Sequence, residues 1–163
     1  MIDKTPGHAS AEEWLTWPGA MVWRRTFPGR ADQIRCARNF AASLFEGSKR
    51  QEDIRELVSE LAANAVVHTR SGRPGGWFGL EVITDKLARI AIRDLGGAGA
   101  PNVRTEPLAG SELRVSGRGL FLVRAKAVGI GVHGCPAHGH TVWVDIDLNT
   151  EPEAGTEALL GAW

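Results

Sequence analysis

The order in which helical and strand-like hydrophobic spacing follow one another along the chain is the strongest constraint on its fold. Apolar residues recur at helical spacing in segments 31–46 and 52–68, and segment 119–128 predicts a third helix that opens at a glycine. Helices that are grouped before and between strand pairs predict an α/β protein of the α+β kind, a two-layer sandwich with helices on one face of a mixed, mostly antiparallel sheet. The strands are expected at 20–29, 77–85, 87–95, 129–135 and 140–148.

The length of 163 residues suits one domain with a substantial core. We expect this domain to span residues 20–148. Residues 1–19 mix Pro, Gly and Trp without a clear period and are interpreted as an N-terminal extension. Residues 149–163 are interpreted as a C-terminal tail.

Composition excludes several classes of partner. Lys plus Arg and Asp plus Glu both number 19, so no net charge favours direct binding to nucleic acid or to an acidic membrane. No apolar run approaches the about 20 residues that cross a bilayer, and the first residues lack the regions of a signal peptide. Cys36 and Cys135 lie far apart in unlike contexts. A protein of the reducing cytoplasm is therefore predicted.

The segment ELAANAVVH, residues 60–68, contains a carboxylate and a carboxamide in an otherwise apolar helical pattern. On a helical wheel, Glu60 and Asn64 lie about 40° apart at the rim of the buried stripe. Partly buried carboxylate and amide groups need hydrogen-bonding or ionic partners, which a ligand or a metal ion can supply. A solvated helix edge is the alternative interpretation of these two residues alone.

Three other segments add polar groups or bare backbone. The segment IRDLGG ends an apolar strand with Asp94 and places Gly96 beside it, where a carboxylate can accept a hydrogen bond from an amino-bearing ring. SGRGLFLV places Gly117 and Gly119 where a helix begins, so backbone amides and the helix dipole suit an anion. GHTVWVDID places Thr141 at the start of the last strand. Singly, each segment also fits an ordinary turn or strand.

Together the four motifs resemble those of the GHKL (Bergerat-fold) ATPase superfamily. They are E-L-A-A-N-A at 60–65, D-L-G at 94–96, G-R-G-L at 117–120 and T-V-W-V at 141–144. The resemblance extends over about residues 20–148, and within the superfamily the chain is similar to short actinobacterial anti-sigma-factor serine/threonine kinases. It implies a Bergerat ATP-binding fold with ATP and Mg²⁺ as cofactors.

The resemblance also implies roles at the phosphate end of the nucleotide. Asn64 would coordinate Mg²⁺ that bridges the phosphates, and Glu60 would orient or deprotonate the attacking hydroxyl as the catalytic residue. A carboxamide suits the ion, since Mg²⁺ takes oxygen ligands and keeps several waters. The backbone at the phosphates would come from Gly117, Arg118, Gly119 and Leu120.

At the base end, the resemblance implies that Asp94 accepts the adenine amino group and that Thr141 supports the base. Gly96 would allow the backbone to approach the nucleotide, and residues 97–116 would form the ATP lid. A competing feature lies in the last hairpin, where four donors follow the pattern H-x-C-x2-H-x-H and suit zinc. Its members are His133, Cys135, His138 and His140; the alternative is a plain surface hairpin.

The function implied is that of an ATP-binding regulatory protein, an anti-sigma factor with serine/threonine kinase activity toward an anti-anti-sigma partner of the STAS type. Its partners would be that protein, a sigma factor, or both, and a homodimer is compatible with the family. The rival hypothesis is a non-catalytic nucleotide-binding module that sequesters a sigma factor or another regulator. Retention of both Glu60 and Asn64 favours the enzyme.

Overall fold

The computed structural model describes residues 20–97 and 127–151, and the secondary structure there follows the predicted pattern. Residues 119–126 of the third predicted helix lie outside the described residues, and its last two, Ala127 and Val128, are not helical. A short 3-10 helix at Arg70–Gly72 was not predicted. The elements are β1 (Met21–Pro28), α2 (Ala31–Ser43), α3 (Gln51–His68), η1 (Arg70–Gly72), β2 (Trp77–Thr84), β3 (Ala88–Arg93), β4 (Gly129–Cys135) and β5 (Gly139–Ile146).

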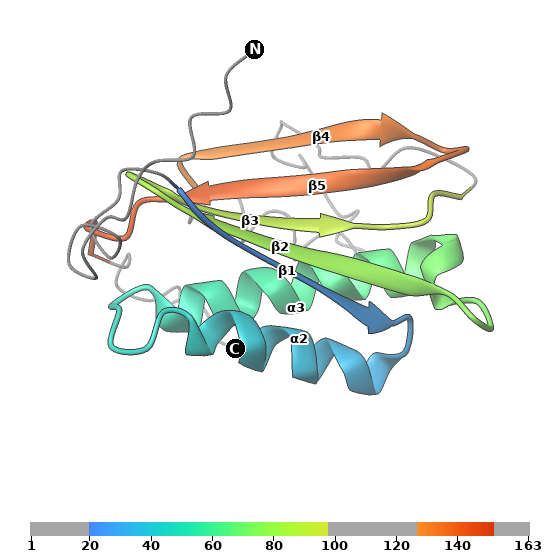
Figure 1. The fold of residues 1–163 in the computed structure, drawn as a ribbon, viewed down its shortest axis with the longest axis horizontal. Helices are drawn as coiled ribbons and strands as arrows, with labels where there is room; N and C mark the ends of the chain where they lie inside the picture. Colours follow the sequence, from blue (N-terminus) through green and yellow to red (C-terminus); the bar gives the residue numbers. More distant parts are fainter. Residues whose placement is uncertain (1–19, 98–126, 152–163) are drawn as a thin grey trace, which may run out of the picture.

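The described strands form one five-stranded sheet in the order β1-β2-β3-β5-β4, and all four pairings are antiparallel. β5 lies between β3 and β4, although a long segment separates it from β3 in sequence. α2 and α3 pack against each other and cover one face of the sheet (Figure 1). The predicted two-layer α+β sandwich is therefore confirmed.

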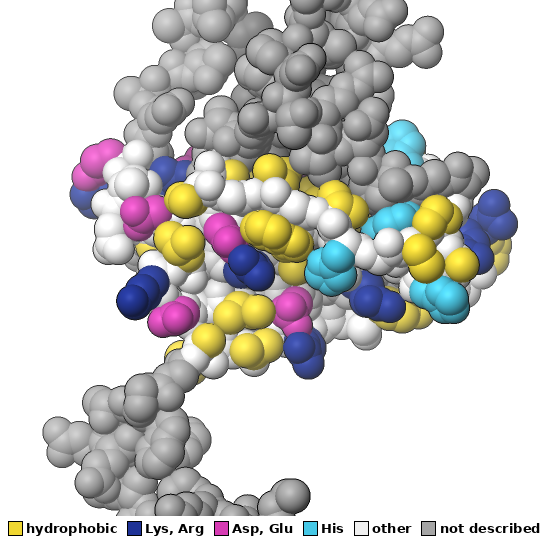
Figure 2. Space-filling model, turned by 90° about the horizontal axis from the view of Figure 1, so that it is seen from above, with side chains coloured by type: hydrophobic (Ala, Val, Ile, Leu, Met, Phe, Trp, Pro, Cys, Tyr) yellow, Lys and Arg dark blue, Asp and Glu magenta, His cyan; other side chains and the backbone are white. Residues whose placement is uncertain are grey.

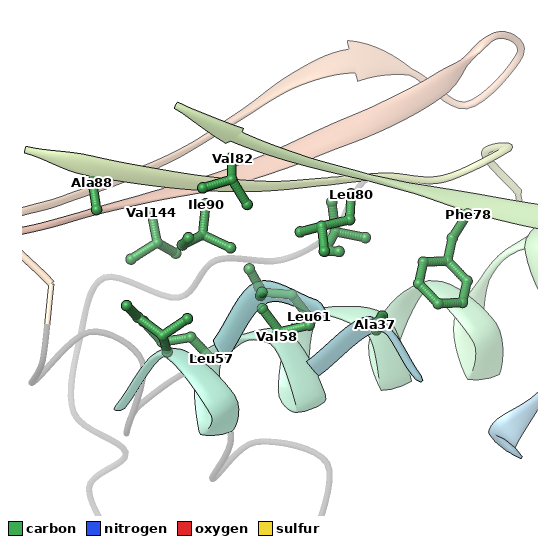
Figure 3. Close-up of a cluster of buried hydrophobic side chains, with 14 of the residues drawn as sticks. Ala37, Leu57, Val58, Leu61, Phe78, Leu80, Val82, Ala88, Ile90 and Val144 are labelled. Carbon is green, nitrogen blue, oxygen red and sulfur yellow. The ribbon is translucent and has the colours of Figure 1, made fainter. Parts of the chain in front are cut away.

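The core fills the space between the two layers. Phe78, Leu80 and Val82 of β2 point from the sheet toward the helix layer, from which Leu57 and Leu61 of α3 enter the same space, and all five are nearly inaccessible to solvent (Figure 3). Phe78 also stacks on Phe27 of β1, with ring centroids 5.4 Å apart. Apolar burial of this kind contributes about 25 cal/mol per Å², so it is the main force that holds the helices on the sheet.

Strand alternation divides β5 between two environments. Val142 and Val144 pack into the core on the helix side, whereas Trp143 faces the opposite side. There its indole lies over Gly131, where an added Cβ would be 2.4 Å from the ring. The Arg89 guanidinium stacks on the Trp143 ring, 4.3 Å from the ring centroid. Figure 2 shows this side of the sheet, with apolar side chains among basic and acidic ones.

Candidate functional site

Glu60 and Asn64 lie on the flank of α3 that faces away from α2. The Arg55 guanidinium donates to the Asn39 carboxamide oxygen at 2.9 Å, which identifies the side of α3 next to α2. At 3.6 residues per turn, Glu60 and Asn64 lie about 140° to 180° around the helix from Arg55. Both are half-buried, and no hydrogen bond joins either side chain to another residue within the described ranges. Their polar groups are therefore available to a ligand beside α3.

Asp94 is buried directly after β3, with 3% of its surface exposed. Its Oδ1 atom accepts hydrogen bonds from the backbone N–H groups of Gly96 at 2.5 Å and His140 at 3.0 Å. These bonds fix the carboxylate between β3 and β5. No hydrogen bond from a described residue reaches the second carboxylate oxygen, which leaves an acceptor for an amino group of a ligand.

The backbone after Asp94 makes a tight turn that only glycine accommodates. Gly96 has a φ of +74°, and a Cβ atom there would lie 2.2 Å from the carbonyl oxygen of Pro136. Both the left-handed conformation and the close approach exclude an ordinary side chain. The turn therefore packs closely against the connection between β4 and β5.

Arg70 joins this turn to the end of α3 and to the β4–β5 connection. Its backbone N–H donates to the Gly96 carbonyl at 2.7 Å. Its guanidinium donates from Nε and Nη2 to the Leu95 carbonyl, at 2.9 and 2.6 Å, and from Nη2 to Pro136 and Ala137, at 3.2 and 2.7 Å. The end of α3, the end of β3 and the β4–β5 connection consequently lie together (Figure 1).

The carboxyl end of α3 has its own local determinants. Thr69 terminates the helix with an extended backbone, its hydroxyl donates to the Ala65 carbonyl at 2.6 Å, and it accepts from the Ser71 N–H at 3.0 Å. Ser71 is fully buried, and its hydroxyl accepts from the Leu95 N–H at 3.0 Å. Asn64, about one turn before the end of α3, is thereby placed at the same end of the sheet as Asp94.

His140 is a further polar residue at this end of the sheet, and its sequence context predicted only a place in the hairpin cluster of possible zinc ligands. It is 2% exposed, and its Nδ1 atom lies 3.6 Å from Asp94 Oδ1. Both ring nitrogens are buried and have no hydrogen-bond partner in the described part of the chain. The alternation in 139–146, with Val142 and Val144 inward, was the signal that could have placed His140 beside Asp94.

Other predicted site residues lie elsewhere or outside the described ranges. Thr141 pairs with Arg93 in the sheet and lines the surface of the opposite face together with Arg89 and Trp143. The structure therefore does not bring its side chain together with Asp94. The predicted phosphate residues and the predicted lid from residue 98 onward lie outside the described residues; the former are Gly117, Arg118, Gly119 and Leu120.

The hairpin donors considered for zinc are divided by the sheet. His140 is buried on the helix side, whereas His133 lies on the other face among the residues that surround Thr141. Cys135 Sγ lies 3.3 Å from His138 Nδ1, and this hydrogen bond lowers the pKa of the thiol. Within residues 20–97 and 127–151, no group of three or more His, Cys, Asp or Glu side chains is arranged to hold a metal ion.

The donor set at the end of α3 and β3 suits a purine nucleotide with a hard cation. Asp94 offers a fixed acceptor, the Gly96 turn packs closely against Pro136 beside it, and within the described ranges neither ring nitrogen of the adjoining His140 has a hydrogen-bond partner. The carboxamide of Asn64 is an oxygen ligand of the kind that Mg²⁺ accepts, and one protein ligand can suffice because the ion keeps waters and binds phosphates.

This architecture and this end of the sheet define an α+β ATPase-type domain. The family model of the histidine kinase-like ATPase domain matches residues 27–144, and the chain belongs to that family. ATP is the ligand that such a domain binds. A search of curated proteins found no match. No helix in the described part of the chain is long and apolar enough to cross a membrane.

Proposed function

We propose that this protein is an ATP-dependent serine/threonine protein kinase that phosphorylates a small anti-anti-sigma partner and thereby regulates a sigma factor. The observation that carries the proposal is the common position of Glu60 and Asn64, half-buried on the flank of α3 away from α2, with Asn64 about one turn before the helix end that lies beside the Asp94 turn. A carboxylate in this position would orient the attacking serine or threonine hydroxyl and accept its proton. Nucleotide binding alone does not require it.

Base recognition would rest on Asp94. A carboxylate fixed by two backbone N–H groups accepts the exocyclic amino group of adenine without having to reorganise. Guanine has a carbonyl oxygen in the place of that amino group, and this oxygen and the Asp94 carboxylate would repel each other. The proposed site therefore favours ATP over GTP.

At the phosphate end, Asn64 would hold Mg²⁺, which supplies charge neutralisation for phosphoryl transfer when it is bound. Glu60 would accept the proton of the attacking serine or threonine hydroxyl and orient its oxygen. Catalysis in such sites consists largely of positioning and electrostatic stabilisation. By the family resemblance, the backbone of 117–120 would bind the phosphates.

The decisive experiment compares two variants of α3 in the transfer of labelled phosphate from ATP to serine-bearing STAS-type domains. Glu60→Gln should bind ATP with nearly unchanged affinity but transfer phosphate about 10² to 10⁴-fold more slowly, because general-base assistance is lost. Asn64→Ala should lose the Mg²⁺ dependence of nucleotide binding. Glu56→Gln, an exposed carboxylate one turn earlier, is the matched control.

The same experiment tests the rival function. A wild-type protein that binds ATP and a sigma factor, transfers no phosphate to any candidate partner and is insensitive to Glu60→Gln would be a nucleotide-binding sequestration module. The serine/threonine kinase proposal would then be rejected, while the family assignment would stand.

A further inference from the structure

His140 is the buried polar side chain of the described core whose hydrogen-bonding capacity is entirely unused. His140 is 2% exposed, and among the residues that the structure describes neither ring nitrogen has a hydrogen-bond partner. Burial of a polar group without a hydrogen bond is unfavourable, and native proteins rarely retain such a group without a reason. A ligand that hydrogen-bonds to the ring would remove this penalty on binding.

The position of the ring indicates which part of a ligand it would meet. Nδ1 lies 3.6 Å from Asp94 Oδ1, and the backbone N–H of His140 is one of the two donors that fix that carboxylate. Any base that pairs with Asp94 is therefore next to the imidazole. A neutral imidazole has one N–H donor and one acceptor, so it can offer a donor beside the carboxylate acceptor.

We propose that His140 contacts the nucleotide base directly and donates a ring N–H to N1 of adenine, while Asp94 accepts from the adjacent amino group. The inference rests on the proposed recognition of adenine by Asp94. Adenine presents a donor at its amino group and an acceptor at N1, which complements an acceptor and a donor side by side. Guanine presents the reverse at both atoms, so His140 would be a second determinant of specificity for ATP.

The test is a cycle between protein and ligand, measured by isothermal titration calorimetry with Mg²⁺ present. Wild-type protein should bind ATP about 5-fold more tightly than 1-deaza-ATP, which lacks N1, because one hydrogen bond is lost. In His140→Met, the two ligands should bind equally. His140→Gln retains a donor and should keep part of the preference. His133→Met makes the same substitution at an exposed position of β4 and should behave as wild type.

Thermal unfolding without nucleotide separates this role from simple packing. Since His140→Met removes two unpaired buried nitrogens, its Tm should equal or exceed that of the wild type. A lower Tm together with an unchanged preference for ATP over 1-deaza-ATP would show a packing residue and overturn the inference. Loss of ATP affinity in Thr141→Val but not in His140→Met would equally overturn it.

Failure of the inference is distinguishable from failure of the proposed function. A wild-type protein that binds ATP but has no preference over 1-deaza-ATP would refute the contact with His140 and leave the role of Asp94 intact. Purine riboside triphosphate, which lacks the amino group, measures the role of Asp94 separately. A wild-type protein that binds none of these nucleotides would refute both.

Discussion

Replacement of Arg70 by methionine should destabilise the protein and loosen the base-binding end of the site. Methionine retains most of the apolar length of the side chain but removes the guanidinium that serves the carbonyls of Leu95, Pro136 and Ala137. Hydrogen bonds to charged groups contribute about 1.5 to 3 kcal/mol each. The bonds to Pro136 and Ala137 are exposed and contribute less, and bonds that share one group are not additive.

The part-buried pair of bonds to Leu95 therefore dominates, and we expect a loss of about 2 to 3 kcal/mol in the free energy of unfolding. For a protein of this size, that corresponds to a decrease of about 4 to 12 °C in Tm. Urea unfolding followed by circular dichroism measures the free energy, and calorimetry measures ATP affinity. Affinity should fall as well, because the turn after Asp94 keeps only the backbone bond from residue 70 and the Ser71 bond to the end of α3 and loses those of the guanidinium.

Two further variants sharpen the measurement. Arg73→Met removes an exposed arginine three residues later and should change the free energy of unfolding by less than about 0.5 kcal/mol. Arg70→Lys keeps the charge but not the planar fork, so it should recover only part of the loss. If Arg70→Met were as stable as Arg73→Met, the guanidinium would not connect the three segments, and the reasoning would be wrong.

Two other predictions concern the same end of the sheet. Gly96→Ala should lower the free energy of unfolding in urea by about 2 to 4 kcal/mol, because left-handed backbone strain adds to the clash with the Pro136 carbonyl. Gly47 has a φ of +79°, and a Cβ atom there would meet no described atom within 4 Å, so Gly47→Ala should suffer the strain alone. Equal losses in the two variants would exclude the clash. The pKa of the Cys135 thiol is lowered mainly by its hydrogen bond with His138. In the wild type, Cys135 should therefore react with iodoacetamide at lower pH than in His138→Ala. Mass spectrometry of the modified Cys135 peptide measures both pH profiles, and identical profiles would contradict the role of His138.

Local periodicity was sufficient to predict the layers of this fold. The stripe of Ile54, Leu57, Leu61 and Ala65 has the spacing of one helix face, and all four residues are buried. The same periodicity placed Glu60 and Asn64 at the rim of that stripe, where they are half-buried. These features are encoded within a few turns of a single element, so they can be read without knowledge of the rest of the chain.

Contacts between distant segments could not be predicted in this way. The bonds from Arg70 to Leu95 and Ala137 depend on which strands become neighbours, and no periodicity specifies that arrangement. The position of His140 was missed for a related reason, since it follows from the alternation along β5 and from which strand lies beside Asp94, whereas the local motif of three histidines and one cysteine suggested only a metal site. The 3-10 helix at Arg70–Gly72 depends on the Thr69 hydroxyl, a single side-chain bond.

The place of β5 between β3 and β4 has a consequence for the folding of the chain. One of the two backbone N–H groups that bind Asp94 belongs to His140 of β5, so the carboxylate is fully fixed only after this strand, distant in sequence, has paired with β3. Closure of such a long loop is an entropically costly and slow step. Chains still on the folding pathway would therefore lack the base-binding site, and ATP would stabilise completed molecules without assisting the earlier steps.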